Sequence, residues 1–235
     1  MPLSQSQSID GLMEDASEAL ARMAYLRCEA KCLEALALAR RAGDWRYYAR
    51  ILMPLQEARR QRRMTAADGV LRLGTSDASD GAAWTDRWLA THRAGCAALS
   101  EPLDRSAAQA MRDRCRAEQR YVEVLFITQR TPAAWTVSDV TGRLRCERPA
   151  PPEAWRDRDV PPQTPEHAAG ARDWFLDAME ALGDAGLREA GMAADLSARM
   201  QKLEQAIEAA GDHELLHQAL GQVVHQLEKG DGSPA

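Results

Sequence analysis

The sequence predicts an α+β protein that is mostly helical, with helices towards both ends and a small α/β layer between them. Three observations predict it. Apolar residues recur at helical spacing over 9–63 and again beyond 167, short β-branched and apolar runs lie over 66–148, and six prolines fall within 149–165. We therefore expect four segments: a helical hairpin at 1–65, a small α/β domain at 66–148, a proline-rich linker at 149–165 and C-terminal helices at 166–235.

The composition favours close-packed helices. Hydrophobic residues make up 45% of the chain, whereas aromatic residues make up only 5%. A core of this composition rests on Leu, Ala, Val and Met, which pack well between helices. The net charge of −5 argues against a polyanion-binding role for the chain as a whole.

The first predicted segment contains three helices. An apolar stripe predicts the first helix after residue 8, and the second spans residues 25–41 and ends at Gly43, a residue suited to a left-handed C-cap. The third helix runs from Trp45 to about Arg62, and Pro54 inside it is expected to bend it or to shift its start.

In the middle segment, turn residues bound most of the short apolar runs, and two helical patterns lie between them. We expect helices at 82–92 and 105–119, and we expect residues 122–128 to form a central strand. The other strands are expected at 69–73, 96–99, 134–137 and 143–147. The order of the strands does not follow from the sequence, but Thr128–Thr131 is a candidate for the open edge where α/β proteins bind ligands.

The C-terminal segment carries three predicted helices. The first, from about Trp174, is expected to be interrupted by Gly183 and Gly186, and the others span 192–209 and 212–227. Residues 173–231 contain twelve acids and four bases, whereas residues 40–63 contain eight arginines and two acids. This asymmetry predicts a contact between the two ends of the chain, or between one of them and a partner.

The N-terminal helices resemble a tetratricopeptide repeat. Small and large residues fall at the spacings of that family over roughly one repeat: Leu12, Ala16, Tyr25, Cys28, Cys32, Ala35 and Leu36. Arg40 stands where the family has a helix-ending proline, and Ala16 replaces its glycine. The resemblance implies a stacked helical hairpin that binds protein partners. Because about three repeats are needed for a stable solenoid, this hairpin must pack on the rest of the chain or on another subunit.

The string His213-Glu214-Leu215-Leu216-His217 matches the HExxH signature of zinc peptidases. Histidines at i and i+4 can share one zinc ion while the glutamate acts as base. The longer signature adds a glycine and a third histidine in the spacing HExxHxxGxxH. Here three residues separate His217 from Gly221 and three separate Gly221 from His225, one too many in each case. We therefore favour an ordinary helix start capped by Asp212, with both histidines at the edge of its apolar stripe, and we expect no metal, cofactor-binding or catalytic residues.

The interaction residues are expected in the third helix. The run from residue 58 to 63 is rich in arginine and ends a helix, where cations also offset the helix dipole. Cys28 and Cys32, one turn apart, are expected to pack rather than to bind a soft metal. We expect a protein partner, or a second copy of the chain, to contact six side chains: Trp45, Tyr48, Arg59, Arg60, Arg62 and Arg63.

The five scattered cysteines include no CxxC pair, no apolar run approaches the ~20 residues of a membrane span, and the N-terminus lacks a signal-peptide pattern. These features predict a cytoplasmic protein without a membrane partner. The favoured function is a non-enzymatic interaction or scaffold protein. The alternatives are a zinc-dependent hydrolase that uses the histidine string and, less favoured, a weak nucleic-acid-binding regulator that uses the arginine-rich helix.

Overall fold

The computed structural model describes residues 5–78 and 80–231 of the chain and divides into two compact units. The helical unit combines the described parts of 1–62 and 186–235, and the α/β unit comprises 63–185. The first and last predicted segments therefore contribute to one unit. Among the described residues, no helix is both long enough and apolar enough to cross a lipid bilayer. The predicted fold class, a mostly helical α+β protein, is confirmed.

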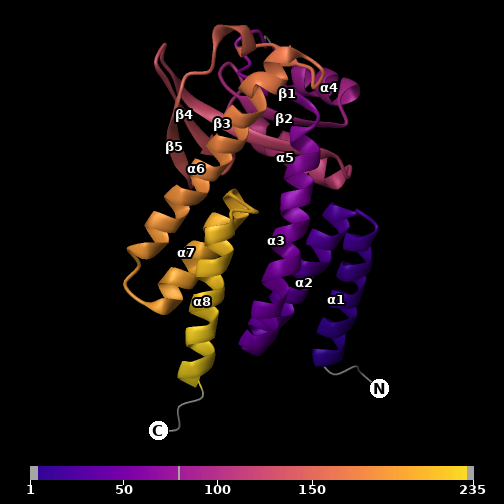
Figure 1. Cartoon of the computed structure of the whole chain (residues 1–235), viewed down its shortest axis with the longest axis vertical. Coiled ribbons are helices and arrows are strands. Elements are labelled where there is room, and N and C mark those ends of the chain that lie inside the picture. Colours follow the sequence, from indigo (N-terminus) through magenta and orange to yellow (C-terminus); the bar gives the residue numbers. More distant parts are fainter. Residues whose placement is uncertain (1–4, 79, 232–235) are drawn as a thin grey trace. The chain divides into compact units, whose positions relative to one another are not determined.

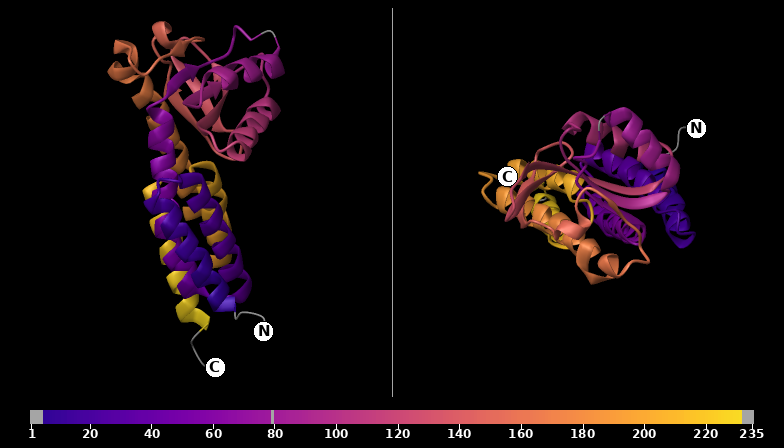
Figure 2. Two further views of the ribbon diagram at one scale, coloured as in Figure 1. Left: turned by 90° about the vertical axis from the view of Figure 1, so that its right-hand side faces the viewer. Right: turned by 90° about the horizontal axis from the view of Figure 1, so that it is seen from above.

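The helical unit is built from long helices that run beside one another (Figures 1 and 2). They are α1 (Gln5–Ala21), α2 (Tyr25–Ala42), α3 (Trp45–Ala67), α7 (Leu196–Ala209) and α8 (Glu214–Asp231). Helices α1 and α2 are in extensive contact, and the small side chains of Ala16, Cys28 and Cys32 on them are fully buried. As predicted, α2 ends at Gly43 with a left-handed φ of 66°. Helix α3 continues through Pro54 to Ala67.

Helix α6 (Arg172–Gly191) differs from its prediction, because it is continuous through Gly183 and Gly186. The predicted interruption is wrong. Both glycines are buried, so tertiary packing on this side of the helix outweighs the ~1 kcal/mol that a glycine costs in a helix interior.

The α/β unit contains one mixed sheet with the strand order β5-β4-β3-β2-β1-β6. Its first three strands, β1 (Val70–Leu73), β2 (Ala94–Leu99) and β3 (Tyr121–Arg130), are parallel, and β4 (Ala134–Asp139) and β5 (Arg145–Pro149) continue it as antiparallel hairpins. The expected central position of residues 122–128 is confirmed. All four other expected strands are also present, within three residues at each end.

Both crossover helices, α4 (Gly81–Thr91) and α5 (Arg105–Ala117), pack on one face of the sheet. Trp84, Trp88 and Met111 from these helices form a core with Val124 and Phe126 of β3. The strand order advances steadily from β1 to β3, so the parallel part has no point at which the order reverses. Doubly wound α/β proteins bind their ligands at such a switch point.

The proline-rich segment is folded against the sheet. It contains the 3₁₀ turn Glu153–Trp155 and the two-residue strand β6 (Asp159–Val160), which pairs with β1 in antiparallel orientation. A π-helical turn, His167–Ala171, then leads into α6, whose Trp174 ring meets Trp135 of β4 edge to face at 5.7 Å between ring centroids. Helix α6 therefore lies against the hairpin part of the sheet.

Candidate functional site

The four arginines predicted to contact a partner occupy different environments. Arg59 and Arg62 are buried, and both form ion pairs with the buried carboxylate of Glu29 on α2. The Arg59 Nε donates to Glu29 Oε1 at 2.7 Å, and its Nη1 donates to the carbonyl oxygen of Ile207 at 3.0 Å. Arg60 is exposed and pairs with Glu57 one turn away, whereas Arg63 is half-buried and belongs to the α/β unit. Arg59 thus joins α2, α3 and α7 inside the helical unit, and Arg62 joins α2 and α3.

Of the two predicted aromatic contact residues, Tyr48 is buried and Trp45 is half-buried. Tyr48 is buried, and its hydroxyl donates to Glu204 Oε1 of α7 at 2.7 Å. Burial and this hydrogen bond raise the pKa of Tyr48 far above its usual value. Trp45 is half-buried and meets the Tyr48 ring edge to face at 6.0 Å between centroids. Arg40 forms an ion pair with the same Glu204 carboxylate, so the two oppositely charged ends of the chain do meet within the molecule.

An apolar pocket of about 230 Å³ lies beside these paired charges. Its buried walls come from α3, α7 and α8 and include Leu52, Leu55 and Leu220. Its rim is formed by α2, where Leu33 is 43% exposed and Ala37 is also exposed. The full lining is Leu33, Leu36, Ala37, Arg40, Tyr48, Leu52, Leu55, Arg59, Glu204, Ile207, Glu208 and Leu220. The walls of the pocket are therefore mainly apolar, and its charged lining residues are Arg40, Arg59, Glu204 and Glu208.

The histidine string begins α8, but not in the predicted arrangement. The helix starts at Glu214, and His213 Nδ1 accepts the backbone N–H of Leu216 at 3.3 Å, so His213 fills the cap position that the sequence assigned to Asp212. His213 and His217 are nevertheless buried, at 1% and 4% exposed. The Nε2 of His217 lies 2.8 Å from the carbonyl oxygen of Gly211, in the turn that precedes the helix.

Geometry around the two histidines does not assemble a metal centre within the described residues, where no group of three or more His, Cys, Asp or Glu side chains is placed to hold an ion. Glu214, the proposed base of the zinc alternative, is exposed and accepts a hydrogen bond from Gln218 at 2.8 Å. Burial lowers the pKa of His217 to about 4, and the nearby Arg59 and His213 act in the same direction. His217 is therefore neutral near pH 7.

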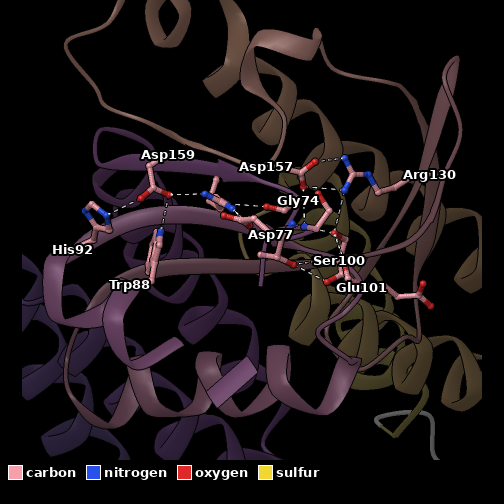
Figure 3. Close-up of polar contacts among 12 residues, drawn as sticks. Gly74, Asp77, Trp88, His92, Ser100, Glu101, Arg130, Asp157 and Asp159 are labelled. Atoms are coloured by element: carbon pink, nitrogen blue, oxygen red, sulfur yellow. Dashed lines mark hydrogen bonds and ion pairs between the residues drawn. The ribbon is translucent and has the colours of Figure 1, made fainter. Parts of the chain in front are cut away.

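The second candidate site is the edge of the sheet where the parallel strands end (Figure 3). Thr75, which follows β1, and Ser100, which follows β2, are both buried and bond reciprocally. The Thr75 N–H donates to Ser100 Oγ at 3.0 Å, and the Ser100 N–H donates to Thr75 Oγ1 at 2.9 Å. The hydroxyl oxygens of Thr75 and Ser100 at this edge thus already accept hydrogen bonds from backbone N–H groups.

An arginine–aspartate pair lies over the same edge. Arg130, at the end of β3, donates two hydrogen bonds of 2.9 and 2.7 Å to the Asp157 carboxylate, which also accepts the Ser76 N–H at 3.0 Å. Burial opposes ionisation of Asp157, but Arg130 and Ser76 outweigh it and lower its pKa. Gly74 is required beneath the pair, because its φ is +91° and a Cβ there would lie 2.4 Å from Asp157 Oδ1.

A second set of polar contacts fastens β6 at the other end of this network (Figure 3). Asp159 accepts the indole N–H of Trp88 at 3.1 Å and lies 3.3 Å from His92 Nε2. It also lies 3.6 Å from the guanidinium of the buried Arg72, which forms a further ion pair with Asp77. These contacts hold the proline-rich segment along β1, so the polar residues of this edge bind one another.

A wider cleft of about 730 Å³ adjoins this edge and is more open to solvent than the pocket of the helical unit. Two of its charged residues are occupied. Asp104 caps α5 by accepting the Ala107 N–H at 2.8 Å, and the guanidinium of Arg105 stacks on Phe126 at 5.6 Å. The remaining lining is Ser76, Glu101, Pro102 and Leu103. Such an open depression encloses a ligand less well than a concave apolar pocket does.

Comparison with protein-family models, with curated proteins and with solved structures finds no match for this chain. The assignment of a site therefore rests on the geometry alone. Sequence reasoning missed the pocket, but one signal for it was present: Leu52, Leu55 and Arg59 lie at i, i+3 and i+7 on one face of α3. That spacing separates the buried Arg59 from its exposed neighbour Arg60.

Proposed function

We propose that this chain is a non-enzymatic protein-interaction module whose helical unit binds an apolar anchor residue of a partner helix. The observation that carries the proposal is the pocket on α2, α3, α7 and α8, whose rim is exposed and whose walls are apolar. A helix laid along a groove and anchored by one bulky side chain is a recurring mode of recognition. The weak tetratricopeptide resemblance of α1 and α2 supports the same class of function.

The size of the pocket supports a single anchor. An apolar cavity of about 150 Å³ stays dry and accommodates a benzene-sized molecule. A pocket of about 230 Å³ is therefore large enough for one aromatic or branched aliphatic side chain. Anchors of this kind contribute most of the binding energy when a polar rim surrounds them and excludes water. Here Arg40, Glu204 and Glu208 supply polar groups around the apolar walls.

The state of the cysteines supports a reducing compartment such as the cytoplasm for this function. All five are free thiols, and four of them are buried. Proteins of oxidising compartments more often pair their cysteines in disulfides.

Blocking the mouth of the pocket tests the proposal. A displayed library of amphipathic helical peptides is selected on the wild-type protein, and the recovered peptides are then measured against Ala37→Trp. Ala37 is exposed on the rim, so the indole covers the mouth without entering the core. We expect binding to weaken by about tenfold or more, the effect of losing a hot-spot contact. Ala49→Trp, on an exposed position of α3 outside the pocket lining, is the matched control.

Two results would contradict the proposal. One is a set of peptides that bind Ala37→Trp as tightly as the wild type. The other is equal weakening by Ala37→Trp and Ala49→Trp, since a general effect of a surface tryptophan would then explain the loss.

A further inference from the structure

The exposed face of α2 that forms the rim of the pocket continues as a regular stripe along the helix. Ala30, Glu34, Ala37 and Arg41 recur every three or four residues, and Leu33 stands beside them. All five are exposed, and Leu33 is one of the few large apolar side chains that remain so. This spacing of four, three and four residues places the side chains on one side of α2. Within the chain, α2 contacts α1.

We propose that this face of α2 binds the same face of a second copy of the chain, with the two helices antiparallel. The inference rests on the proposed function and names its partner: the helix that reaches the rim of the pocket is α2 of another copy. Ala30 and Ala37, one heptad apart, carry only methyl groups, and the distance between two packed helices shortens when the contacting side chains are small. Leu33 of each copy then lies near the pocket rim of the other.

Charge complementarity determines the orientation. Glu34 and Arg41 lie seven residues apart on the stripe. A two-fold axis level with Ala37 places Glu34 of each copy opposite Arg41 of the other, so two opposite-charge pairs form at once. A parallel arrangement would place Glu34 opposite Glu34 and Arg41 opposite Arg41, which is unfavourable. The Glu34 side chain is 60% exposed, and its neighbour Lys31 lies 3.6 Å away on its own helix, so its carboxylate remains accessible.

The interface of one helix pair is small, at the lower end of specific protein interfaces. We therefore expect a concentration-dependent dimer with a Kd on the order of 10 to 100 μM. The dimer and a peptide in the pocket compete, because both reach the same rim at Ala37 and Leu33.

A charge swap tests the inference by sedimentation velocity of the full chain over a range of concentrations. Glu34→Arg and Arg41→Glu are each expected to weaken dimerisation by about tenfold or more, because each creates two like-charge contacts across the two-fold axis. The double variant Glu34→Arg/Arg41→Glu restores both opposite-charge pairs and is expected to regain the dimer. Arg46→Glu, exposed on α3, is the control and is expected to dimerise as the wild type does.

The outcomes separate this inference from the proposed function. A wild-type protein that stays monomeric up to several hundred μM, or a double variant that remains as weak as the single ones, overturns the dimer. If peptides still lose affinity for Ala37→Trp in that case, the pocket remains a partner site. Restoration of the dimer by the double variant, with peptide binding insensitive to Ala37→Trp, instead supports the dimer face and removes the peptide site.

Discussion

The helical unit and the α/β unit both pair arginines with carboxylates, but in different positions. In the helical unit, Arg59 and Arg62 meet Glu29 in the interior, and an apolar pocket stays open beside them. In the α/β unit, Arg130 pairs with Asp157 across the strand-end edge, the place where α/β proteins usually bind ligands. Ion pairs beside a pocket leave it open to a ligand, as in the helical unit. An ion pair across a ligand-binding edge covers that edge, as in the α/β unit.

The edge of the sheet is also less favourable for a ligand on topological grounds. No reversal of strand order occurs from β1 to β3, so the loops that leave these strands do not separate to opposite faces and open a crevice. The proline-rich segment runs along this edge and is fastened by Asp157 and Asp159. This contrast supports the function proposed for the helical unit, and the following measurements test the contrast between the two units.

Removing the buried carboxylate of the helical unit is expected to have the largest effect. Glu29→Gln removes the buried carboxylate that forms ion pairs with both Arg59 and Arg62. Breaking a buried ion pair in this way costs about 3 to 5 kcal/mol. Urea unfolding followed by circular dichroism measures the free energy, and hydrogen exchange of α2 peptides shows which unit loosens.

The control for this substitution is Glu14→Gln, an exposed position on α1, where a change within about 0.5 kcal/mol is expected. Hydrogen exchange of α2 that is unchanged in Glu29→Gln would show that the buried pair does not hold the helical unit together. An equal loss of unfolding free energy in Glu29→Gln and Glu14→Gln would show the same.

His217 predicts a pH dependence that belongs to the helical unit. Its pKa is about 4 in the folded chain, below the usual 6.5, because burial disfavours the charged ring. The unfolded chain therefore takes up this proton first as the pH falls. The stabilising contribution is complete above pH 6.5 and decreases by about 3 kcal/mol as the pH falls to about 4, below which no more is lost.

Urea unfolding at several pH values checks this dependence. The slope of the free energy of unfolding against pH between 6.5 and 4 is expected to be shallower in His217→Gln, in which the amide can still donate to Gly211. His225→Gln, at an exposed position of α8, is expected to retain the wild-type slope. A His217→Gln slope identical to that of the wild type would mean that this ring titrates normally in the folded chain.

The smallest expected effect comes from the α/β unit. Asp157→Asn removes the charge from the pair with Arg130, but the two side chains are 23% and 26% exposed, so water compensates in part. We expect a loss of about 1 to 2 kcal/mol, typical of charge-assisted hydrogen bonds. Hydrogen exchange is expected to increase around β6 and to stay unchanged in α2.

Asp173→Asn, at an exposed position of α6, serves as the reference for a surface carboxylate and is expected to change little. If Asp157→Asn loses as much unfolding free energy as Glu29→Gln does, the ion pairs of the two units do not differ in their contribution to stability.

Local patterns were sufficient to predict most of the helices and strands. The end of α2 at Gly43 and the central position of β3 follow from a turn residue and from a β-rich run, and both are confirmed. The continuity of α6 through Gly183 and Gly186 was not predictable, because it depends on what packs against the glycines. The pairing of the proline-rich segment with β1 also lies beyond local patterns, since its partners are far apart in the sequence.

The candidate site could be predicted only in fragments. Charge asymmetry predicted a contact between the two ends of the chain or with a partner, and Arg40 and Glu204 form the first of these. The pocket itself depends on contacts such as that of Tyr48 with Glu204, 156 residues further along the chain. Neighbouring arginines look equivalent in sequence, and only their direction around α3 separates the buried Arg59 from the exposed Arg60.

The most direct test of the central claim is a titration of the protein, labelled at its leucine methyl groups, with indole followed by NMR. If the helical unit holds the binding pocket, the methyl signals of Leu52 and Leu55 shift with increasing indole, while those of Leu99 and Leu103 near the strand ends do not. Shifts confined to Leu99 and Leu103, or no shift at Leu52 and Leu55 up to the solubility of indole, would contradict the account.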